Sequence, residues 1–439
     1  MFWIELIIVL AIIFIGVRVG GTFLAMAGGI GMFIMTFILH VTPSDPPITV
    51  ILIMIAVICA AATMQACGGL DYLVRIAEKI LRKNPKMITV LAPVVAYIFT
   101  FMCGTGHIVY SLLPVINEIA IETGVRPERP ISASIVSSQQ AITACPISAA
   151  TVGILAFMAE ATNYTKVNIF TLLIVCVPAT LIGTVIAAIA VIKKGKELAD
   201  DPEFQARVEA GLIEDFSKKV KEEKKVSKEA KISVTIFLIA MVGIVLLGAV
   251  SGLVPTLADG SKLPLTTVIE IFMLVAAAMI LLTKLDSNKV LDQPVFRTGM
   301  FAVVLAFGLC WLINTFIGDQ SSFITDNMSA LTNKYPWIFI VAVFIVGAIT
   351  TSQSSTTMIM IPIGIALGLP ANVIVAGWIA CSSNYFIPAS GQCVAALAFD
   401  SAGTTKIGKF VLNHSYMIPG LVCTVVSVVV ALLIGAVVF

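Results

Sequence analysis

Two polar interruptions divide long apolar stretches of this chain, and each half of the sequence carries a matched pair. In the first half they are Gly104-Thr105-Gly106-His107 and Cys145-Pro146-Ile147-Ser148. In the second half they are Ser352-Gln353-Ser354-Ser355 and Ile387-Pro388-Ala389-Ser390. Unpaired backbone groups are costly in lipid, so breaks at membrane depth persist only where they are buried in protein or line a polar cavity. Matched breaks in two halves indicate inverted repeats with a binding site near the middle of the membrane.

The composition places the chain in a membrane. It is 59% hydrophobic and 12% charged, and a soluble domain carries about twice that share of charge. Many apolar runs reach the roughly 20 residues that span a bilayer. We therefore expect an all-α polytopic protein whose surroundings are the lipid bilayer. The net charge of +2 comes with no basic patch for nucleic acid, so we expect no nucleic-acid partner.

The apolar runs predict about ten transmembrane spans and two re-entrant hairpins. The arms of the two hairpins, about 87–121 and 336–368, are near 15 residues each and too short for a full crossing. Spans 131–160 and 371–399 contain the Pro-x-Ser breaks. The expected spans are about 2–17, 21–40, 47–66, 131–160, 167–192, 232–251, 264–284, 298–317, 371–399 and 409–437.

The distribution of charge predicts the orientation. Residues 193–231 hold 11 of the 27 Lys and Arg residues, and the positive-inside rule places such a loop in the cytoplasm. Counting spans outward from this loop puts both termini in the periplasm and opens the two hairpins from opposite sides. We therefore divide the chain into a first inverted repeat (1–192), a charged cytoplasmic loop (193–231) and a second inverted repeat (232–439).

Each break creates helix ends inside the protein, and helix N-termini attract anions. We expect the chain to re-enter a helix after Gly106, Ser148, Ser355 and Ser390. Glycines at these positions allow tight backbone turns. Hydroxyl and amide groups there can bind carboxylate oxygens without a positively charged side chain. The predicted substrate-binding residues are Gly104, Thr105, Gly106, His107, Gln139, Pro146, Ser148, Ser352, Gln353, Ser354, Ser355, Asn384, Pro388, Ser390 and Gly391.

The predicted spans contain almost no charge. No Arg or Lys lies deep in any of them, and Glu270 is the main acidic exception. A proton-driven cation exchanger would show buried carboxylates, so a neutral, hydroxyl-rich site favours an anionic substrate. His107 is the one titratable group at a tip, and it either donates to a carboxylate or gains a proton with the substrate. The alternatives are a neutral histidine bonded to backbone, and hydroxyls that only join helices.

Nothing in the sequence points to catalysis. It lacks Gly-x-Ser-x-Gly, His-Glu-x-x-His and a paired aspartyl motif, and its nine cysteines lie in or beside apolar segments without metal-site spacing. We therefore expect no enzyme activity, catalytic residue, cofactor or metal. One further pattern lies before the first hairpin, where residues 71–82 place apolar and charged side chains on opposite faces. This pattern predicts a helix that lies in the membrane interface or packs on the protein.

Several segments resemble the anaerobic C4-dicarboxylate transporters of the Dcu A/B type. They include Arg82-Lys83-Asn84-Pro85-Lys86, Cys103-Gly104-Thr105-Gly106-His107, Arg126-Pro127-Glu128-Arg129-Pro130, Gly403-Thr404-Thr405 and Asn413-His414. The resemblance covers nearly the whole chain in order. It implies exchange of fumarate, malate or aspartate for succinate across a bacterial inner membrane during anaerobic growth. It also implies the ion-transporter superfamily fold, usually dimeric, with an elevator-like moving domain.

The chain departs from that family pattern at two predicted site elements. Ile387-Pro388-Ala389-Ser390-Gly391 stands where the family commonly has Leu-Pro-Thr-Tyr-Pro, and Ser354-Ser355 replaces a usual pair of alanines. These differences leave other functions open. One is a sodium- or proton-coupled di- or tricarboxylate symporter of the same superfamily. Another is an anion channel, and the last is a dicarboxylate co-sensor that acts with a partner such as a sensor kinase.

Overall fold

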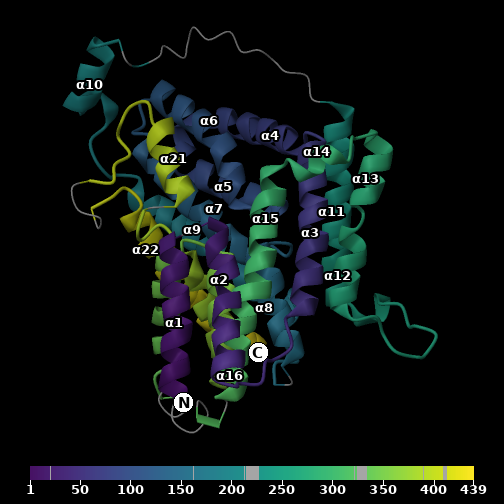
Figure 1. Cartoon of the computed structure of the whole chain (residues 1–439). Coiled ribbons are helices and arrows are strands. Elements are labelled where there is room, and N and C mark those ends of the chain that lie inside the picture. The colour runs from purple at the N-terminus through teal and green to yellow at the C-terminus, as the bar shows by residue number, and fades with distance from the viewer. Residues whose placement is uncertain are drawn as a thin grey trace.

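The computed structural model of the chain consists of helices (Figure 1). It describes residues 1–439 except 20, 162, 212, 214–226, 321, 324–333, 389 and 409–412. Within these residues the only strand-like pairing is an isolated bridge between Thr256 and Lys262, so the all-α prediction is confirmed. Parts of three predicted features lie outside the described residues: the loop 193–231, Ala389 in the second break, and the start of the last span at 409.

In the first half, the helices follow the predicted order. A five-residue π-helix, Ile34–Ile38, extends α2. The bounds are α1 Phe2–Val19, α2 Gly21–Phe33, α3 Ile48–Ala66, α4 Gly69–Lys83, α5 Ile88–Cys103, α6 Val109–Glu122, α7 Glu128–Ala144, α8 Ala149–Glu160 and α9 Ile169–Val191.

The second half follows a short helix, α10, at Pro202–Glu209. A second π-helix, Ala306–Cys310, joins α15 to α16. The bounds are α11 Lys228–Ala249, α12 Leu265–Met273, α13 Ala276–Thr283, α14 Asn288–Leu291, α15 Pro294–Leu305, α16 Trp311–Asp319, α18 Trp337–Thr350, α19 Gln353–Ala366, α20 Ala371–Ile379, α21 Gly391–Phe399 and α22 Met417–Val438.

Eight helical stretches among the described residues are long and apolar enough to cross a membrane, and four shorter apolar ones accompany them. The chain is therefore a polytopic membrane protein. The shorter class includes α18 and the stretches Phe2–Gly16, Thr22–Ile38 and Ala371–Ser382, whereas Pro85–Cys103, predicted as one arm of a hairpin, falls in the longer class. The re-entrant hairpins and the inverted repeats stay predictions.

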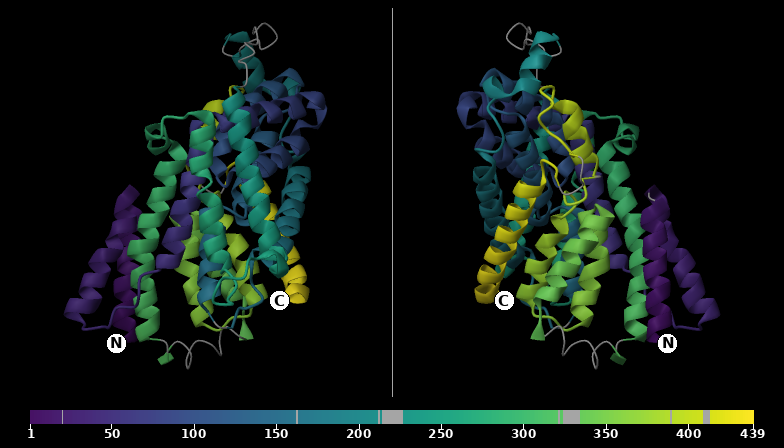
Figure 2. Two further views of the ribbon diagram at one scale, coloured as in Figure 1. Left: turned by 90° about the vertical axis from the view of Figure 1, so that its right-hand side faces the viewer. Right: turned by 90° about the vertical axis from the view of Figure 1, so that its left-hand side faces the viewer.

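The helices form two groups. The core group contains α5–α9 and α18–α22, with α9 packed along α22, and α5, α7 and α9 packed on one another. The flanking group contains α1–α3 and α11–α16, in which α2 packs on the π-helix Ala306–Cys310. Figure 2 shows α1, in purple, and α22, in yellow, at opposite sides of the molecule. The core group holds all four interruptions singled out in the sequence.

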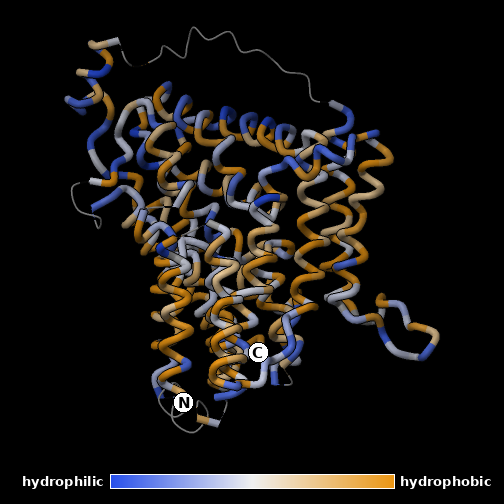
Figure 3. Tube along the Cα trace, viewed as in Figure 1, coloured by the Kyte–Doolittle hydropathy of each residue, from blue (hydrophilic) through white to orange (hydrophobic). Residues whose placement is uncertain are grey.

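Both ends of the chain lie toward one end of the molecule, and α10 lies toward the other (Figures 1 and 2). The first hairpin, α5 and α6, occupies the half nearer α10, while α18 and α19 occupy the opposite half (Figure 2). Hydrophilic residues gather at the α10 end, and apolar residues predominate along the helices below it (Figure 3).

Helix α4 packs on protein, which is the second of the two interpretations of residues 71–82. Its apolar face buries Leu73, Ala77 and Leu81 against α5, α6 and α11. On the polar face, Arg82 pairs with Glu78 at 2.8 Å and with Glu118 of α6 at 2.9 Å. The helix thereby connects α3 of the flanking group to the first hairpin of the core group.

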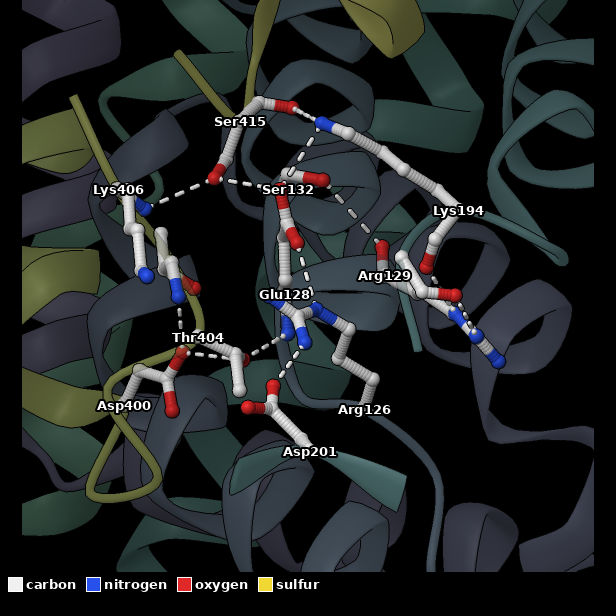
Figure 4. A network of polar contacts seen from close by, with 12 residues as sticks. Arg126, Glu128, Arg129, Ser132, Lys194, Asp201, Asp400, Thr404, Lys406 and Ser415 are labelled. Atoms are coloured by element: carbon white, nitrogen blue, oxygen red, sulfur yellow. Dashed lines mark hydrogen bonds and ion pairs between the residues drawn. The ribbon is translucent and has the colours of Figure 1, made fainter. Parts of the chain in front are cut away.

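A polar network at the α10 end joins three separate segments (Figure 4). Glu128, the first residue of α7, accepts a hydrogen bond from Ser415 at 2.8 Å and pairs with Lys194 at 3.0 Å. Arg126 bridges Glu128 and Asp201, which caps α10. Burial by itself would raise the pKa of Asp201, but the hydrogen bond from Arg126 holds that pKa below its usual value. The network therefore ties the loops before α10 and α22 to the start of α7.

The contact between α2 and the second π-helix generates a prediction with a built-in control. A Cβ atom on Gly28 would lie 2.2 Å from the backbone carbon of Gly308, whereas one on Gly29 would meet no atom within 4 Å. Gly28→Ala should therefore lower the free energy of unfolding by about 1–3 kcal/mol through overpacking. Gly29→Ala should raise it by up to about 1 kcal/mol through helix propensity. Thermal unfolding of the two purified variants checks this, and equal midpoints would contradict the packing.

Candidate functional site

The four helices that follow the interruptions begin with the same device. Helices α8, α19 and α21 directly follow a Ser in extended conformation, whereas before α6 the extended Thr105 caps a short 3-10 turn, Gly106–Ile108, that runs into the helix. Each of these side-chain oxygens accepts a hydrogen bond from a backbone N–H two or three residues later. Such N-caps satisfy one of the N–H groups that a helix start leaves without an intrahelical partner. The caps are Thr105 to His107 (3.3 Å), Ser148 to Thr151 (3.1 Å), Ser352 to Ser355 (3.2 Å) and Ser390 to Cys393 (3.4 Å).

The two hairpin tips turn through left-handed residues. Helix α5 ends at Gly104 with φ at 70°, and α18 ends at Thr351 with φ at 53°. Glycine adopts this conformation without steric cost, whereas a β-branched threonine is strained in it. Because the turn is complete at Thr351, helix α19 starts at Gln353. The expected helix start after Ser355 is therefore wrong by one turn.

The N-termini of these four helices border one cavity of about 330 Å³. Each contributes its first residues to the lining, where a helix still has unpaired N–H groups and partial positive charge. The residues are Gly106 and His107 before α6, Ala149 of α8, Gln353 and Ser354 of α19, and Gly391 and Gln392 of α21. The cavity is therefore rich in hydrogen-bond donors.

The opposite wall of the cavity is largely apolar and comes from the flanking group. It is formed by one face of α3 and the first turns of α15. Among the described residues, the whole lining contains no Asp, Glu, Lys or Arg. The wall residues are Met54, Val57, Ile58 and Ala61 of α3, and Val295, Thr298, Gly299, Phe301 and Ala302 of α15.

A cluster of three amide side chains joins the two halves of the sequence at the cavity. Gln139 Oε1 accepts hydrogen bonds from Gln353 Nε2 and, at 2.7 Å, from Asn384 Nδ2. Gln353 Nε2 also donates to the backbone oxygen of Gln139 at 3.3 Å. All three residues line the cavity. The cluster holds Gln353, at the turn between α18 and α19, and Asn384, between α20 and α21, against α7 of the first half.

The first tip and the second break also meet closely. A Cβ atom on Gly106 would lie 2.6 Å from Gln392 Nε2, and one on Gly391 would lie 2.9 Å from Tyr110 Oη. Tyr110 stacks on His107 with ring centroids 5.7 Å apart. A side chain at either glycine would displace the Gln392 amide or the Tyr110 hydroxyl, and Gly391 belongs to the stretch where the chain departs from the family pattern.

The comparisons with known proteins agree with this architecture. A family model described as "Anaerobic c4-dicarboxylate membrane transporter" matches residues 1–439. The chain belongs to the DcuA/DcuB family. It is 38% identical over 434 residues to the anaerobic C4-dicarboxylate transporter DcuB of Escherichia coli O6:H1, which covers 98% of this chain and 97% of the relative.

Two DcuA proteins are equally similar. The C4-dicarboxylate transporter DcuA of Wolinella succinogenes is 38% identical over 433 residues, or 98% of each chain. DcuA of Escherichia coli K12 is 38% identical over 435 residues, or 99% of each chain. The resemblance stated from the sequence is thus confirmed, and the chain belongs to a family of membrane transporters rather than enzymes.

In this DcuA/DcuB member, eleven of the fifteen predicted site residues line the cavity. The other four, Pro146, Ser148, Ser355 and Pro388, do not. Ser148 is 1% exposed and is used for the cap of α8, while Ser355 donates to the Ser352 hydroxyl at 2.9 Å. The eleven are Gly104, Thr105, Gly106, His107, Gln139, Ser352, Gln353, Ser354, Asn384, Ser390 and Gly391.

Sequence reasoning did not single out Tyr110 or the apolar wall, whereas it did expect Gln392, as part of the break 387–392, to lie at the site. Tyr110 lies three residues after His107, about one helical turn from the tip, and that spacing was a usable signal. Gln392 lies two residues beyond the Ser390 cap, where the amino end of α21 meets the cavity. The wall of α3 and α15 gave no signal, because its residues are ordinary for apolar spans.

The amide cluster gives a prediction with a neighbouring control. Gln139→Leu would leave two buried donors unpaired, and we expect it to lower the free energy of unfolding by about 2 kcal/mol. Gln140 has buried side-chain N and O atoms with no partner within the described residues, so Gln140→Leu should be neutral or stabilising. Thermal unfolding in detergent compares the two. A larger loss in Gln140→Leu would contradict the assigned contacts.

Proposed function

We propose that this DcuA/DcuB-family protein exchanges C4-dicarboxylates such as fumarate, malate, aspartate and succinate across the bacterial inner membrane. The observation that carries the proposal is one cavity bordered by four helix N-termini and by hydroxyl and amide groups. N–H and O–H donors with positive helix ends bind carboxylates without a cationic side chain. The DcuA and DcuB relatives, named as C4-dicarboxylate transporters, support this substrate class.

The lack of charge in the described lining also supports exchange. Moving one charge across the membrane potential changes the free energy by about 2.3 kcal/mol per 100 mV. A dianion entering an inside-negative cell alone therefore works against about 4.6 kcal/mol at that potential. Because the lining supplies no fixed cation to travel with the dianion, an outgoing dianion is the simplest source of compensation.

The two-sided lining supports an elevator-like mechanism. The polar contacts come from the core group, and the apolar wall comes from α3 and α15 of the flanking group. A substrate held by the core group can therefore move with it past a wall that is largely apolar. We propose that the core group carries the substrate while the flanking group stays in place.

The proposed orientation follows from charge and from the position of the hairpins. We place the α10 end in the cytoplasm and both termini in the periplasm, with 1–192 and 232–439 as inverted repeats on either side of the charged loop 193–231. Support comes from the hydrophilic residues at the α10 end (Figure 3) and from the opposite placement of the two hairpins (Figure 2). A homodimer and a sensor-kinase partner are further proposals that rest on the family resemblance.

Counterflow in proteoliposomes tests the exchange. Vesicles containing the purified protein are loaded with succinate, and uptake of labelled fumarate, malate and aspartate is followed with and without sodium. We expect internal succinate to accelerate uptake several-fold without any sodium requirement, because each entering dicarboxylate replaces one that leaves. Empty vesicles and citrate-loaded vesicles are the controls.

Each alternative function has its own signature in this assay. Uptake that requires sodium or a pH gradient and ignores internal succinate would identify a cation-coupled symporter. Uptake in empty vesicles driven by membrane potential alone would identify a channel. No uptake of any dicarboxylate under all conditions would reject transport of this substrate class.

A further inference from the structure

The amide cluster beside the cavity has only one consistent hydrogen-bond orientation. The backbone oxygen of Gln139 can only accept, and the Nε2 atom of Gln353 lies 3.3 Å from it. That end of the Gln353 side chain is therefore its NH2 group. The same NH2 group faces Gln139 Oε1, so the atom of Asn384 that shares Oε1, at 2.7 Å, must also be a donor.

This orientation leaves the other end of Asn384 without a partner. Asn384 lines the cavity and is 2% exposed, and its Oδ1 atom is buried with no hydrogen-bond partner among the described residues. Buried acceptors are nearly always paired in folded proteins, so an exception calls for an explanation. Among the described residues that line the cavity, Asn384 Oδ1 is the one buried side-chain acceptor left without a partner, and a donor on the ligand would pair it.

Among C4-dicarboxylates, that requirement separates two kinds of molecule. Fumarate and succinate as dianions present only oxygen acceptors and C–H groups, and their carboxylates would repel Asn384 Oδ1. Malate adds a hydroxyl donor at C2, and aspartate adds an ammonium donor at the same carbon. The lining holds no acid among its described residues, so no carboxylate competes for the ammonium group.

The position of Asn384 suits a substituent next to a carboxylate. Gln353 is the first residue of α19, where unpaired N–H groups face an anion. Through Gln139, Gln353 and Asn384 belong to one cluster. A carboxylate at the start of α19 would therefore have the Asn384 amide next to it, which suits a donor on the neighbouring carbon, C2.

We propose that Asn384 Oδ1 accepts a hydrogen bond from the C2 substituent of the substrate. The site then selects C4-dicarboxylates with a hydroxyl or ammonium donor at C2 over those without one. This inference rests on the proposed function, because it assigns the substrate preference of the same cavity.

Half-saturation concentrations in the counterflow assay test the preference. For the wild-type protein we expect malate and aspartate to bind about tenfold more tightly than succinate and fumarate, the range of one hydrogen bond. Asn384→Leu should bring the ratio close to one. Gln140→Leu is the matched control, since it removes a buried amide that lies outside the cavity lining and should keep the wild-type ratio.

A ligand-side measurement covers the case in which Asn384→Leu does not fold. 2-Methylsuccinate carries a methyl group where malate carries its hydroxyl, and the wild-type protein should bind it no better than succinate. Equal affinity for malate and 2-methylsuccinate would overturn the proposal, as would a malate preference that survives in Asn384→Leu. A succinate affinity that rises to that of malate at acid pH would assign the donor to a protonated carboxyl group and also overturn it.

The outcomes distinguish a failure of this inference from a failure of the proposed exchange function. If none of the four substrates is exchanged, the proposed function fails. If all four are exchanged with equal half-saturation concentrations, exchange stands and only the role of Asn384 fails. If malate binds tightly while aspartate has the same half-saturation concentration as succinate, the site accepts only a hydroxyl donor at C2. That result would still support Asn384 Oδ1 as the acceptor.

Discussion

The structure depends on how backbone N–H groups are satisfied where helices break inside the protein. Each of four interruptions is closed by one hydroxyl, from Thr105, Ser148, Ser352 or Ser390, that caps the helix after it or, at Thr105, the 3-10 turn that leads into it. A single cap satisfies only part of a helix start, and the remaining N–H groups need another acceptor. Because those helix starts border one cavity, the proposed anionic substrate would supply the acceptor for the N–H groups that remain.

Two contacts between distant parts of the chain bring the interruptions together. The amides of Gln139, Gln353 and Asn384 fix the second tip and the second break to α7, and the close approach of Gly391 to Tyr110 sets the first hairpin against α21. The core group therefore holds the polar contacts as one unit, while α3 and α15 contribute a mostly apolar surface. This division of polar and apolar walls gives the proposed movement its physical basis.

Much of this arrangement was predictable from local chemistry. Gly104 and the hydroxyls at 105, 148, 352 and 390 marked the helix breaks because turns and caps need those residue types. The register at the second tip was not predictable, since Thr351 adopts a left-handed conformation that its β-branched side chain disfavours. The pairing of Gln139 with Gln353 across 214 residues and the wall from α3 and α15 depend on tertiary packing that no local pattern encodes.

The central claim is that a dicarboxylate is bound by helix ends and neutral groups in this cavity. A cryo-electron microscopy structure of the protein in lipid nanodiscs with saturating malate tests it most directly. The account predicts density for a four-carbon dicarboxylate in the cavity, with carboxylate oxygens within hydrogen-bond distance of the first residues of α19 or α21. Ligand density outside the cavity, or carboxylates paired with Lys or Arg side chains, would contradict it.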